Sequence, residues 1–520
     1  MVQQTIERGD RHFHPDLMNR MEASAERNGS VRIVMGVEWG ATLAGQHFVW
    51  MLTSLLARQF GVVREIELRL PDVAPIPGAL LIPREGLAST LRLSLENMIH
   101  MISPDLVRIR QAGEFAKRVH VQFCIGAHAE DDAEHTYHLH ANGWKVRISK
   151  DAKPSCEPPT SSSSIGPYFG ASLAAGEAFK RILSLHSGSG EYIDELEIDV
   201  FEDLANGMTT GKGQSSEVEH EMRPIYVVGA GAVGQAAIAT LATSGVQNLR
   251  LTVVDHDAID KERTNLNRCV LSYDKHANMA KTSALKESLH GLPVSLRLVP
   301  GTWQDFVTHK QTASVPAYEP ELERAGRYRI VLSCVDKNVA RHAVQRSWPQ
   351  HLYGGSTNSF TAKVQTYDMS SHGECLMCIN PQEAAESIEA AAKRFAAMLP
   401  EAQDQAASSL GLDARRMREY AEQPKCGSPA EADLRRFSSG SQQPDASVGF
   451  VSVAAGVLLA ATVLRDQMQE AIRSPEHRVN FSFLRPKALQ RYGHRRSTSC
   501  MCNTDGKLAY RTNWSGNDER

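Results

Sequence analysis

Several polar residues in the second half of the chain have the types and the order needed to bind the phosphates of a nucleotide. Asp255 and Asp257 close an apolar stretch, and Asn265, Arg268 and Lys281 follow in polar contexts that favour helix starts. Reaction at the α-phosphorus of ATP needs cations beside the developing negative charge, and an arginine and a lysine from separate segments can supply them. Any one of these residues alone is more often a solvated surface group, so the interpretation depends on the ordered series.

A glycine-rich turn precedes this series. The stretch IYVVGAGAVGQAAIATLATSGVQNLRLTVVDHD, residues 225–257, predicts a strand, a turn with Gly229, Gly231 and Gly234, a helix and a second strand. Such a turn, followed about 20 residues later by an acid for the ribose hydroxyls, favours an adenine nucleotide without choosing between NAD and ATP. The cationic pair favours ATP, because the two phosphates of NAD need only a helix N-terminus. Asp336, at the end of a third predicted strand, can carry Mg²⁺.

The first half of the chain repeats this plan without its glycines. Strands are predicted at Val31–Met35 and Glu65–Leu70 around an apolar helix, but Gly36 is followed by VEWG instead of AGAVG. Bulky side chains at the turn would keep the backbone away from a pyrophosphate. Two further pairs of similar segments occur in the same order: SSIGPYFGASLAAGEAFKRIL with ASVGFVSVAAGVLLAATVLRD, and ANGWKVRISKD with NSFTAKVQTYD. Any two α/β domains share strand–helix patterns, yet three matches in one order favour a duplication whose first copy is inactive.

Composition and charge narrow the class of protein. The formal net charge of −3 gives no basic field, so we expect no nucleic-acid partner. The N-terminus lacks the apolar core of a secretory signal and nine cysteines are too few for a disulfide scaffold, which predicts reduced thiols and a cytoplasmic location. The charge-free segment Val448–Leu464 imitates a membrane span, but it is slightly short and its counterpart in the first half carries Glu177 and Lys180. We therefore expect a buried helix and no membrane partner.

Four cysteines form two closely spaced pairs. Cys375 and Cys378 follow a predicted strand as C-x-x-C, and Cys500 and Cys502 lie near the C-terminus as C-x-C. Two such pairs predict a tetrahedral structural Zn²⁺ site, although the shorter C-x-C spacing strains the geometry in which the second pair would bind the ion. The alternatives are four reduced thiols that happen to lie close, or a redox dithiol, which the missing thioredoxin-like helix start disfavours. The histidine-rich EHTYHLH, residues 134–140, is a less favoured metal candidate on a predicted exposed strand.

Taken as a set, the motifs of the second half resemble a known family, the E1-like adenylyltransferases of the ThiF/MoeB type. The residues that carry the resemblance are GAGAVG, VVDHD, TNLNR, the lysine of MAKTSA, CVDKNVAR and CLMC, which cover most of residues 223–510. The resemblance implies a fold that binds ATP–Mg²⁺ and adenylates the C-terminal glycine carboxylate of a ubiquitin-like protein. It also implies roles for single residues: the ribose for Asp255, the phosphates for Asn265, Arg268 and Lys281, and the metal for Asp336.

The resembling family works as a pair of folds, and the partner fold sends an arginine into the ATP site from ahead of its first strand. An inactive first copy fits the arrangement with both folds in one chain, as in eukaryotic ubiquitin-activating enzymes and bacterial relatives in ubiquitin-like conjugation operons. Arg11 is the candidate for this arginine, with Arg8 and Arg20 as alternatives.

These patterns and the resemblance together predict an α/β protein with two Rossmann-like adenylation folds, the N-terminal one degenerate and the C-terminal one active. The expected domains are an inactive fold over residues 1–204, a linker over 205–224, an active fold with the zinc site over 225–379 and 446–520, and a helical and loop-like insertion over 380–445.

The insertion contains one cysteine, Cys426, in the polar stretch EQPKCGSPAE. Lys425 can lower the pKa of its thiol, and the thiolate is the attacking species. In the resembling family this region carries the cysteine that takes the activated protein as a thioester. The alternatives are an exposed cysteine without a role and an oxyester on Ser428, for which no base is visible in the local sequence.

The sequence therefore predicts an E1-like activating enzyme that uses ATP, Mg²⁺ and Zn²⁺. A ubiquitin-like protein would be its substrate and an E2-like protein its recipient, and the arrangement is compatible with a homodimer of the chain. Three alternatives remain: a sulfur-carrier activator of the molybdopterin or thiamin type, an NAD-dependent oxidoreductase with structural zinc, and a scaffold that binds ATP without chemistry. The oxidoreductase would have no use for Arg268 or Lys281.

Overall fold

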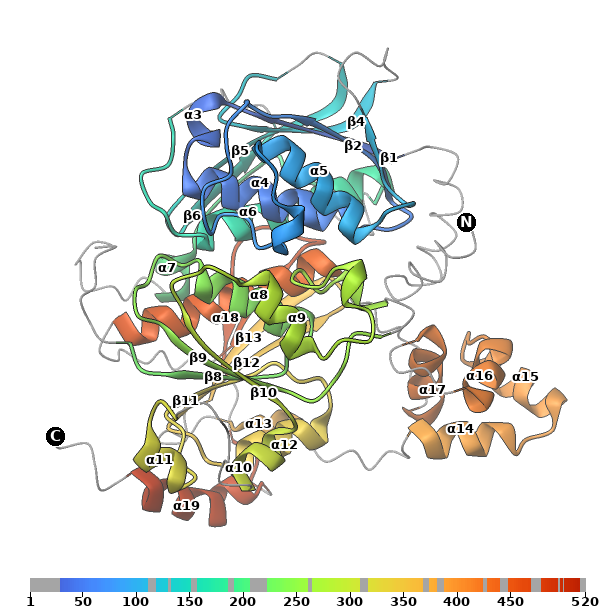
Figure 1. Cartoon of the computed structure of the whole chain (residues 1–520). Coiled ribbons are helices and arrows are strands. Elements are labelled where there is room, and N and C mark those ends of the chain that lie inside the picture. The colour runs from blue at the N-terminus through green and yellow to red at the C-terminus, as the bar shows by residue number, and fades with distance from the viewer. Residues whose placement is uncertain are drawn as a thin grey trace.

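In the computed structural model the chain forms two α/β halves whose helices face one another, with a small helical cluster at one side (Figure 1). The first half contains the strands β1 to β7 and the second half the strands β8 to β15. The structure describes residues 29–110, 118–129, 132–150, 157–185, 191–205, 222–260, 264–308, 317–367, 374–380, 388–423, 428–439, 448–468, 478–493, 496–498 and 500–514.

The first half is built on a sheet with the strand order β3-β2-β1-β4-β5-β6-β7, in which β1 to β5 are parallel and β6 and β7 antiparallel. Its strands are β1 (Gly29–Met35), β2 (Val63–Arg69), β3 (Arg108–Arg110), β4 (Val119–Ile125), β5 (Ala133–Asn142), β6 (Lys145–Ser149) and β7 (Glu195–Asp199). Its helices are α3 (Val37–Gly40), α4 (Leu43–Ala57), η2 (Arg84–Gly86), α5 (Leu91–Ile102), α6 (Ile165–Ile182) and α7 (Val200–Ala205). Consecutive residues of the central strands β1 and β4 are mostly buried, which indicates that both faces of the sheet are covered, whereas burial alternates along β5.

The second half has the strand order β10-β9-β8-β11-β12-β13-β14-β15, parallel from β10 to β12 and antiparallel beyond. Its strands are β8 (Ile225–Val228), β9 (Arg250–Asp255), β10 (Ser295–Pro300), β11 (Ile330–Ser333), β12 (His351–Asn358), β13 (Thr361–Tyr367), β14 (Arg478–Ser482) and β15 (Gln490–Tyr492). Its helices are α8 (Ala232–Ala242), η3 (Thr264–Asn267), η4 (Asp274–His276), α9 (Lys281–Ser288), α10 (Trp303–Thr308), α11 (Pro320–Arg324), α12 (Asn338–Arg346), α13 (Leu376–Ile379), α18 (Gly449–Met468), η5 (Met501–Asn503) and α19 (Asp505–Trp514).

The two sheets share one strand order. The first strand of each half lies in the middle, with β1 between β2 and β4 and β8 between β9 and β11. The segments whose sequences are similar occupy equivalent places: β6 matches β13, and the long helix α6 matches α18. The prediction of two Rossmann-like folds is confirmed, and the common order supports a duplication.

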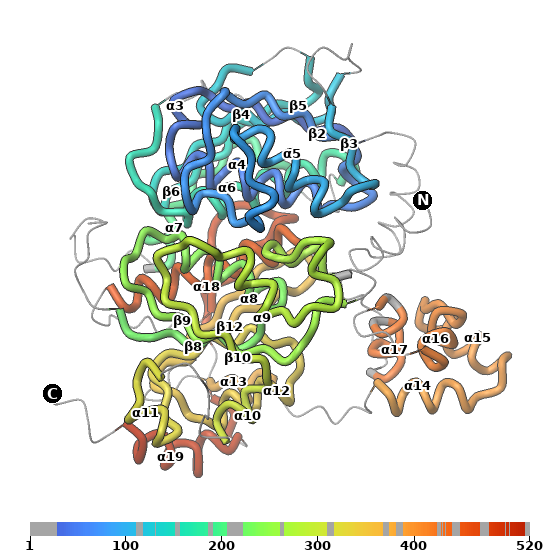
Figure 2. The backbone as a smooth tube through the Cα atoms, viewed as in Figure 1, coloured from blue at the N-terminus to red at the C-terminus, as the bar shows by residue number. Residues whose placement is uncertain are grey.

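The two halves meet through their helices. Helix α18 packs against α8 of its own half and against α6 of the first half, and α6 in turn packs on α4 (Figure 2). A Cβ atom at Gly456 would lie 2.5 Å from the Cβ of Ala236, so glycine permits the close approach of α18 and α8. Helix α18 is long and apolar enough to span a membrane, yet 94% of its most apolar window is buried inside the protein. In this structure α18 is a core helix shared by both halves.

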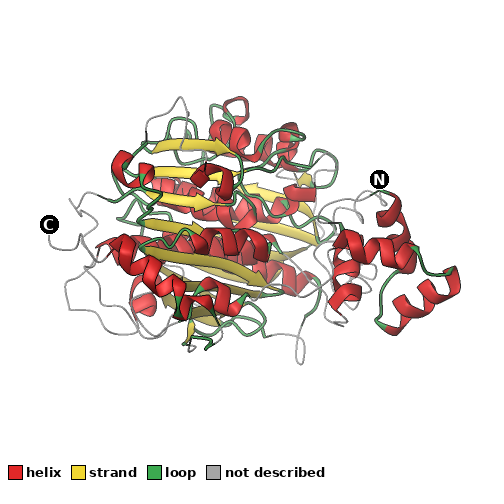
Figure 3. Cartoon of the chain, turned by 90° about the horizontal axis from the view of Figure 1, so that it is seen from below, coloured by secondary structure: helices red, strands yellow, loops and turns green. Residues whose placement is uncertain are grey.

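Four helices between α13 and α18 form the cluster that lies apart from the two sheets (Figure 3). They are α14 (Ile388–Ala396), α15 (Pro400–Ser409), α16 (Ala414–Glu422) and α17 (Pro429–Ser439). The cluster has an apolar core of its own, which includes Phe395, Met417 and Leu434. The helix-prone segment predicted in the insertion corresponds to α14 and α15. The predicted loop is shorter than expected, because α17 begins within the stretch EQPKCGSPAE.

Candidate functional site

The candidate site lies at the carboxyl edge of the second sheet. Strand β8 leads into the glycine-rich turn, β9 ends on Asp255, and Asp336 follows β11. These three strands are parallel neighbours, so their carboxyl ends share one edge. The chain passes from β8 to β9 and β10 on one side and returns to β11 on the other, which makes the gap between β8 and β11 a topological switch point. Open α/β sheets bind their ligands at such points.

The three glycines of the turn differ in what the surrounding structure requires at each position. Gly229 has a φ of +97°, and a Cβ atom at Gly234 would lie 2.0 Å from the Gly229 oxygen. Both positions therefore require glycine for the turn itself. Gly231 is the N-cap residue of α8 and provides no side-chain cap, and a Cβ atom there would meet nothing within 4 Å. The space in front of the free N–H groups of α8 is therefore open to an anion such as a phosphate.

Replacing Gly231 by alanine tests whether this space receives phosphates. We expect the melting temperature to stay close to that of the wild type, because the φ of −75° suits alanine and no atom obstructs the methyl group. The affinity for ATP should fall by about tenfold, because the methyl group occupies space beside the phosphates. Calorimetric titration with ATP measures the effect. Gly234→Ala is the contrasting variant and should be destabilised, and unchanged ATP affinity in Gly231→Ala would exclude phosphate binding at this turn.

Asp255 ties the glycine-rich turn to the loop after β9. Its Oδ2 accepts a hydrogen bond from the Ala230 N–H at 2.6 Å, and its Oδ1 accepts one from the Asp257 N–H at 2.7 Å. The residue is only 8% exposed. Each carboxylate oxygen keeps a second lone pair, which leaves acceptors for a pair of ribose hydroxyls.

Lys281 lies at the start of α9 and forms an ion pair with Asp257. The Nζ atom is 2.8 Å from Oδ2 of Asp257, whose side chain is 52% exposed, and the Lys281 N–H donates to the Asp257 carbonyl. Burial disfavours the charged amine, but the carboxylates of Asp255 and Asp257 outweigh it and raise the pKa of Lys281. The lysine is therefore a buried, charged group at the sheet edge, held by an acid that solvent or a ligand can reach.

Arg268 and Asn265 lie in the segment that follows β9. The Asn265 Oδ1 accepts from the Asp260 N–H at 3.0 Å, so this side chain orders the loop in the present structure. The Nε–H of Arg268 is buried and has no hydrogen-bond partner among the described residues. A buried donor without a partner costs free energy, and a phosphate oxygen would satisfy it. Asp336 is exposed in the turn between β11 and α12.

Two further residues of this edge, Gln235 and Lys337, were not predicted from the sequence. The buried Gln235 amide donates from Nε2 to the Ala230 carbonyl at 3.1 Å and accepts at Oε1 from the Leu271 N–H at 2.9 Å. It therefore joins the glycine-rich turn to the segment after Arg268. The signal for Gln235 was available, since it is the polar residue in the apolar helix AVGQAAIATLA. Burial acts to raise the pKa of Asp257, but the ion pair with Lys281 lowers it, and the charge of Lys337, next to Asp336, adds a smaller lowering effect.

Several predicted site residues lie outside the described part of the chain. These are Arg11 with its alternatives Arg8 and Arg20, and the candidate nucleophile Cys426 with Lys425. Ser428 is described: its Oγ accepts a hydrogen bond from the Glu431 N–H at 3.2 Å at the start of α17. The Ser428 hydroxyl therefore acts as a helix cap in this structure.

The four predicted metal ligands come together. The sulfur atoms of Cys375, Cys378, Cys500 and Cys502 lie within 4.8 Å of one another, and three of the pairs are 3.5 to 3.6 Å apart. A tetrahedral ion with Zn–S bonds of about 2.3 Å would hold its sulfurs about 3.8 Å apart, so the thiols fit Zn²⁺. The C-x-C pair reaches the cluster because Cys502 lies in the tight turn of η5. Hydrogen bonds from Cys375 and Cys502 lower the pKa of the Cys378 thiol.

The equivalent edge of the first sheet is filled by the protein itself. Trp39 is fully buried in α3, and a Cβ atom at Gly126 would lie 1.9 Å from its ring. The indole also packs edge-on against His140 and donates from Nε1 to the Glu157 carbonyl. The space between the ends of β1 and β4 is therefore taken by a side chain, in agreement with a degenerate first copy.

The sequence model described as ThiF family matches residues 216–500, which is more than half of the chain. The chain belongs to the ThiF family. Similarity also extends into the first half, because the Uncharacterized protein y4jF of Sinorhizobium fredii (strain NBRC 101917 / NGR234) is 22% identical over 479 residues, covering 85% of this chain and 86% of that protein.

Two relatives with named activities match part of this ThiF-family chain. The Adenylyltransferase and sulfurtransferase UBA4 of Eremothecium gossypii is 24% identical over 197 residues, which are 36% of this chain and 40% of that enzyme. The Ubiquitin-like modifier-activating enzyme 5 of Arabidopsis thaliana is 28% identical over 177 residues, 32% of this chain and 39% of that enzyme. Solved structures of E. coli MccB align with a TM-score of 0.32 at 17% identity, covering 58% of this chain and 68% of MccB.

Proposed function

We propose that this ThiF-family protein is an E1-like adenylyltransferase that activates the C-terminal carboxylate of a ubiquitin-like protein. The observation that carries the proposal is a pair of cations in the segments that follow β9. Lys281 at the start of α9 is buried and charged, and the buried Nε–H of Arg268 has no hydrogen-bond partner among the described residues. Two cations from separate segments suit a triphosphate better than the diphosphate of NAD. The similarity to UBA4 and to Ubiquitin-like modifier-activating enzyme 5 supports the same reaction class.

In the proposed reaction, the terminal carboxylate of the partner attacks the α-phosphorus of ATP. The bond from that phosphorus to its bridging oxygen breaks, pyrophosphate leaves, and an acyl-adenylate forms. Arg268 and Lys281 stabilise the charge that develops on the phosphate oxygens. The N–H groups at the start of α8 hold a phosphate, and Asp255 accepts from the ribose hydroxyls. Mg²⁺ would neutralise phosphate charge when bound, with the exposed Asp336 as its protein ligand.

The four-cysteine cluster would hold a structural Zn²⁺ in this proposal. Cys375 and Cys378 flank the start of α13, just ahead of the insertion, and Cys500 and Cys502 precede α19 near the C-terminus. All four positions would be taken by thiolates, so no open coordination site would remain for catalysis. The ion would join the root of the insertion to the C-terminal segment.

The second proposed step is transfer of the acyl group to Cys426. The thiolate attacks the acyl carbonyl, AMP leaves, and the thioester then passes to an E2-like protein. Thiol chemistry is favoured over an oxyester on Ser428, because the Ser428 hydroxyl already caps α17 and a serine would also need a base.

Incubation with ATP, labelled pyrophosphate and candidate ubiquitin-like partners tests both steps. We expect partner-dependent exchange of pyrophosphate into ATP, and a covalent conjugate that a thiol reductant cleaves. Cys426→Ala should keep the exchange and lose the conjugate, because adenylation precedes the thiol step. Ser428→Ala is the matched control and should retain both. A conjugate that survives in Cys426→Ala would assign the acceptor to another residue, and tight nicotinamide binding without exchange would favour the oxidoreductase.

Activation of a sulfur-carrier protein is the second candidate. It is favoured by one observation, the similarity to UBA4, an adenylyltransferase and sulfurtransferase. Sulfur-carrier activation predicts the same pyrophosphate exchange, followed by formation of a thiocarboxylate on the partner instead of a thioester on Cys426. Mass spectrometry of the partner's C-terminus separates the two candidates.

A further inference from the structure

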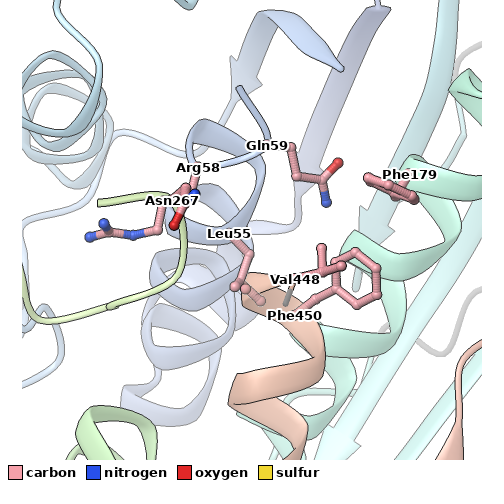
Figure 4. A pocket seen from close by; sticks show the side chains of 8 residues that line it. Leu55, Arg58, Gln59, Phe179, Asn267, Val448 and Phe450 are labelled. Carbon is pink, nitrogen blue, oxygen red and sulfur yellow. The ribbon is translucent and has the colours of Figure 1, made fainter. Parts of the chain in front are cut away.

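A buried arginine of the first half reaches across to the segment that carries Arg268. Arg58 caps the C-terminus of α4 and is 1% exposed. Its Nη1 donates to the Leu266 carbonyl at 2.5 Å, and its Nη2 donates to the carbonyls of Val270 and Ser272 at 3.2 and 2.9 Å. Figure 4 shows the side chain extending from α4 alongside the segment that bears Asn267.

These hydrogen bonds use one cation to satisfy three backbone carbonyls, the first of them in the short helix η3. Buried carbonyls need hydrogen-bond partners, and charged donors form stronger hydrogen bonds than neutral ones. The Nε of Arg58 donates to Ser54 Oγ at 3.2 Å, so its four hydrogen-bond partners are all neutral. Burial lowers the pKa of Arg58 to about 10, which leaves the guanidinium charged at neutral pH.

The same segment is held from two other directions. On its active-site side, Gln235 Oε1 accepts from the Leu271 N–H. At the start of α18, a Cβ atom at Gly449 would lie 2.9 Å from the Asn267 oxygen and 3.4 Å from the Cα of Arg268. The backbone of Arg268 therefore lies between the carbonyls that Arg58 fixes and the first turn of α18, with little room to shift.

We propose that Arg58 is a positioning residue for adenylation, through which the inactive half fixes the backbone from Leu266 to Ser272 and thereby the guanidinium of Arg268. The inference rests on the proposed function for its catalytic consequence. It gives the inactive half a role in the chemistry of the other half that needs no contact with the nucleotide.

Arg58→Met should lower kcat for pyrophosphate exchange by about 100-fold with a smaller change in the KM for ATP, because a displacement of about 1 Å at a catalytic group has effects of this size. Arg58→Lys should recover part of the loss, since an ammonium cannot reach three carbonyls as a planar guanidinium does. Adding Arg58→Met to Arg268→Gln should cause no further loss, because Arg58 acts through Arg268. The proposal would be overturned if the kcat losses of the two single variants multiplied in the double variant. It would also be overturned if Arg58→Met raised only the KM for ATP and left kcat unchanged.

Arg491→Met is the matched control. Arg491 also crosses between the halves and donates from Nη1 to the carbonyls of Asp203 and Leu204, which lie outside the segment from Leu266 to Ser272. This variant should lose stability and keep its kcat. An equal fall of kcat in both variants would reduce Arg58 to a general interface residue and overturn the proposal.

Hydrogen–deuterium exchange provides a readout that needs no enzymatic activity. Amides from Leu266 to Ser272 should exchange faster in Arg58→Met, and to a smaller extent in Arg58→Lys, whereas Arg491→Met should leave them unchanged. Unchanged protection in Arg58→Met would refute the positioning role. If the wild-type chain catalyses no pyrophosphate exchange with any ubiquitin-like partner, the proposed function is wrong. The hydrogen–deuterium exchange of these amides would still show whether Arg58 orders the segment.

Discussion

Replacing Arg268 by glutamine and Lys281 by methionine in one chain is expected to lower partner-dependent pyrophosphate exchange by at least about 10³-fold, since loss of a single charge-stabilising donor already costs about 10² to 10³ in kcat. Both cations would act on negative charge that increases as the carboxylate attacks. The kcat should therefore fall more than the KM for ATP rises. Each single variant should show an intermediate loss in the same assay.

The chain should remain folded in the double variant. Lys281 pairs with Asp257, whose carboxylate is half-exposed, so water can solvate this acid when the lysine is removed. Lys286→Met is the matched control, because Lys286 lies on the same helix α9 and is exposed, whereas Lys281 is buried. Thermal unfolding checks the fold of all variants. If the double variant catalysed pyrophosphate exchange at a rate within a few-fold of the wild type, triphosphate chemistry at this edge would be refuted.

Loss of the four-thiol site is expected to have the largest effect on stability. The purified wild-type chain should contain one zinc ion, and Cys375→Ser combined with Cys502→Ser should contain none, as measured by elemental analysis. Structural Zn²⁺ adds its binding free energy to folding, so the melting temperature should fall by about 10 °C. The fall should be accompanied by faster amide exchange in α19, which packs against the cluster through Ala509 and Tyr510.

Cys124→Ala separates this effect from the loss of a buried cysteine. Cys124 is buried on β4 of the first half and lies outside the four-thiol cluster. Its replacement should leave the zinc content unchanged and cost little stability. The redox alternative would be supported if the wild-type chain contained no zinc and its cysteines formed disulfides reversibly on treatment with oxidant and then reductant.

The parts of the site that the sequence predicts are those with local causes. Gly229, Gly234 and Asp255 lie within one strand–turn–helix–strand unit, and their spacing follows from the geometry of the turn. The order of the strands follows from the duplication, because a repeated pattern of strands and helices predicts a repeated topology. The four cysteines were identifiable because two closely spaced cysteine pairs are typical of structural zinc sites.

The parts that the sequence does not predict depend on contacts between distant segments. Arg58 lies 208 positions before Leu266 in the chain, and nothing in the local sequence LLARQFG indicates which carbonyls it meets. The motif VEWG showed that the phosphate turn is lost, but the packing of Trp39 against Gly126 becomes visible only in the fold. The cap formed by Ser428 likewise depends on where α17 begins.

The burial of α18 between the two halves has a consequence for how activity depends on concentration. When a supporting subunit is a separate chain, dilution below the dissociation constant removes it, and the number of competent sites falls with it. Here the supporting surface belongs to the same polypeptide as the site, so its effective concentration is set by the chain and is independent of the amount of protein in solution. The fusion of the two copies thus makes each chain a self-sufficient unit for contacts such as the one made by Arg58.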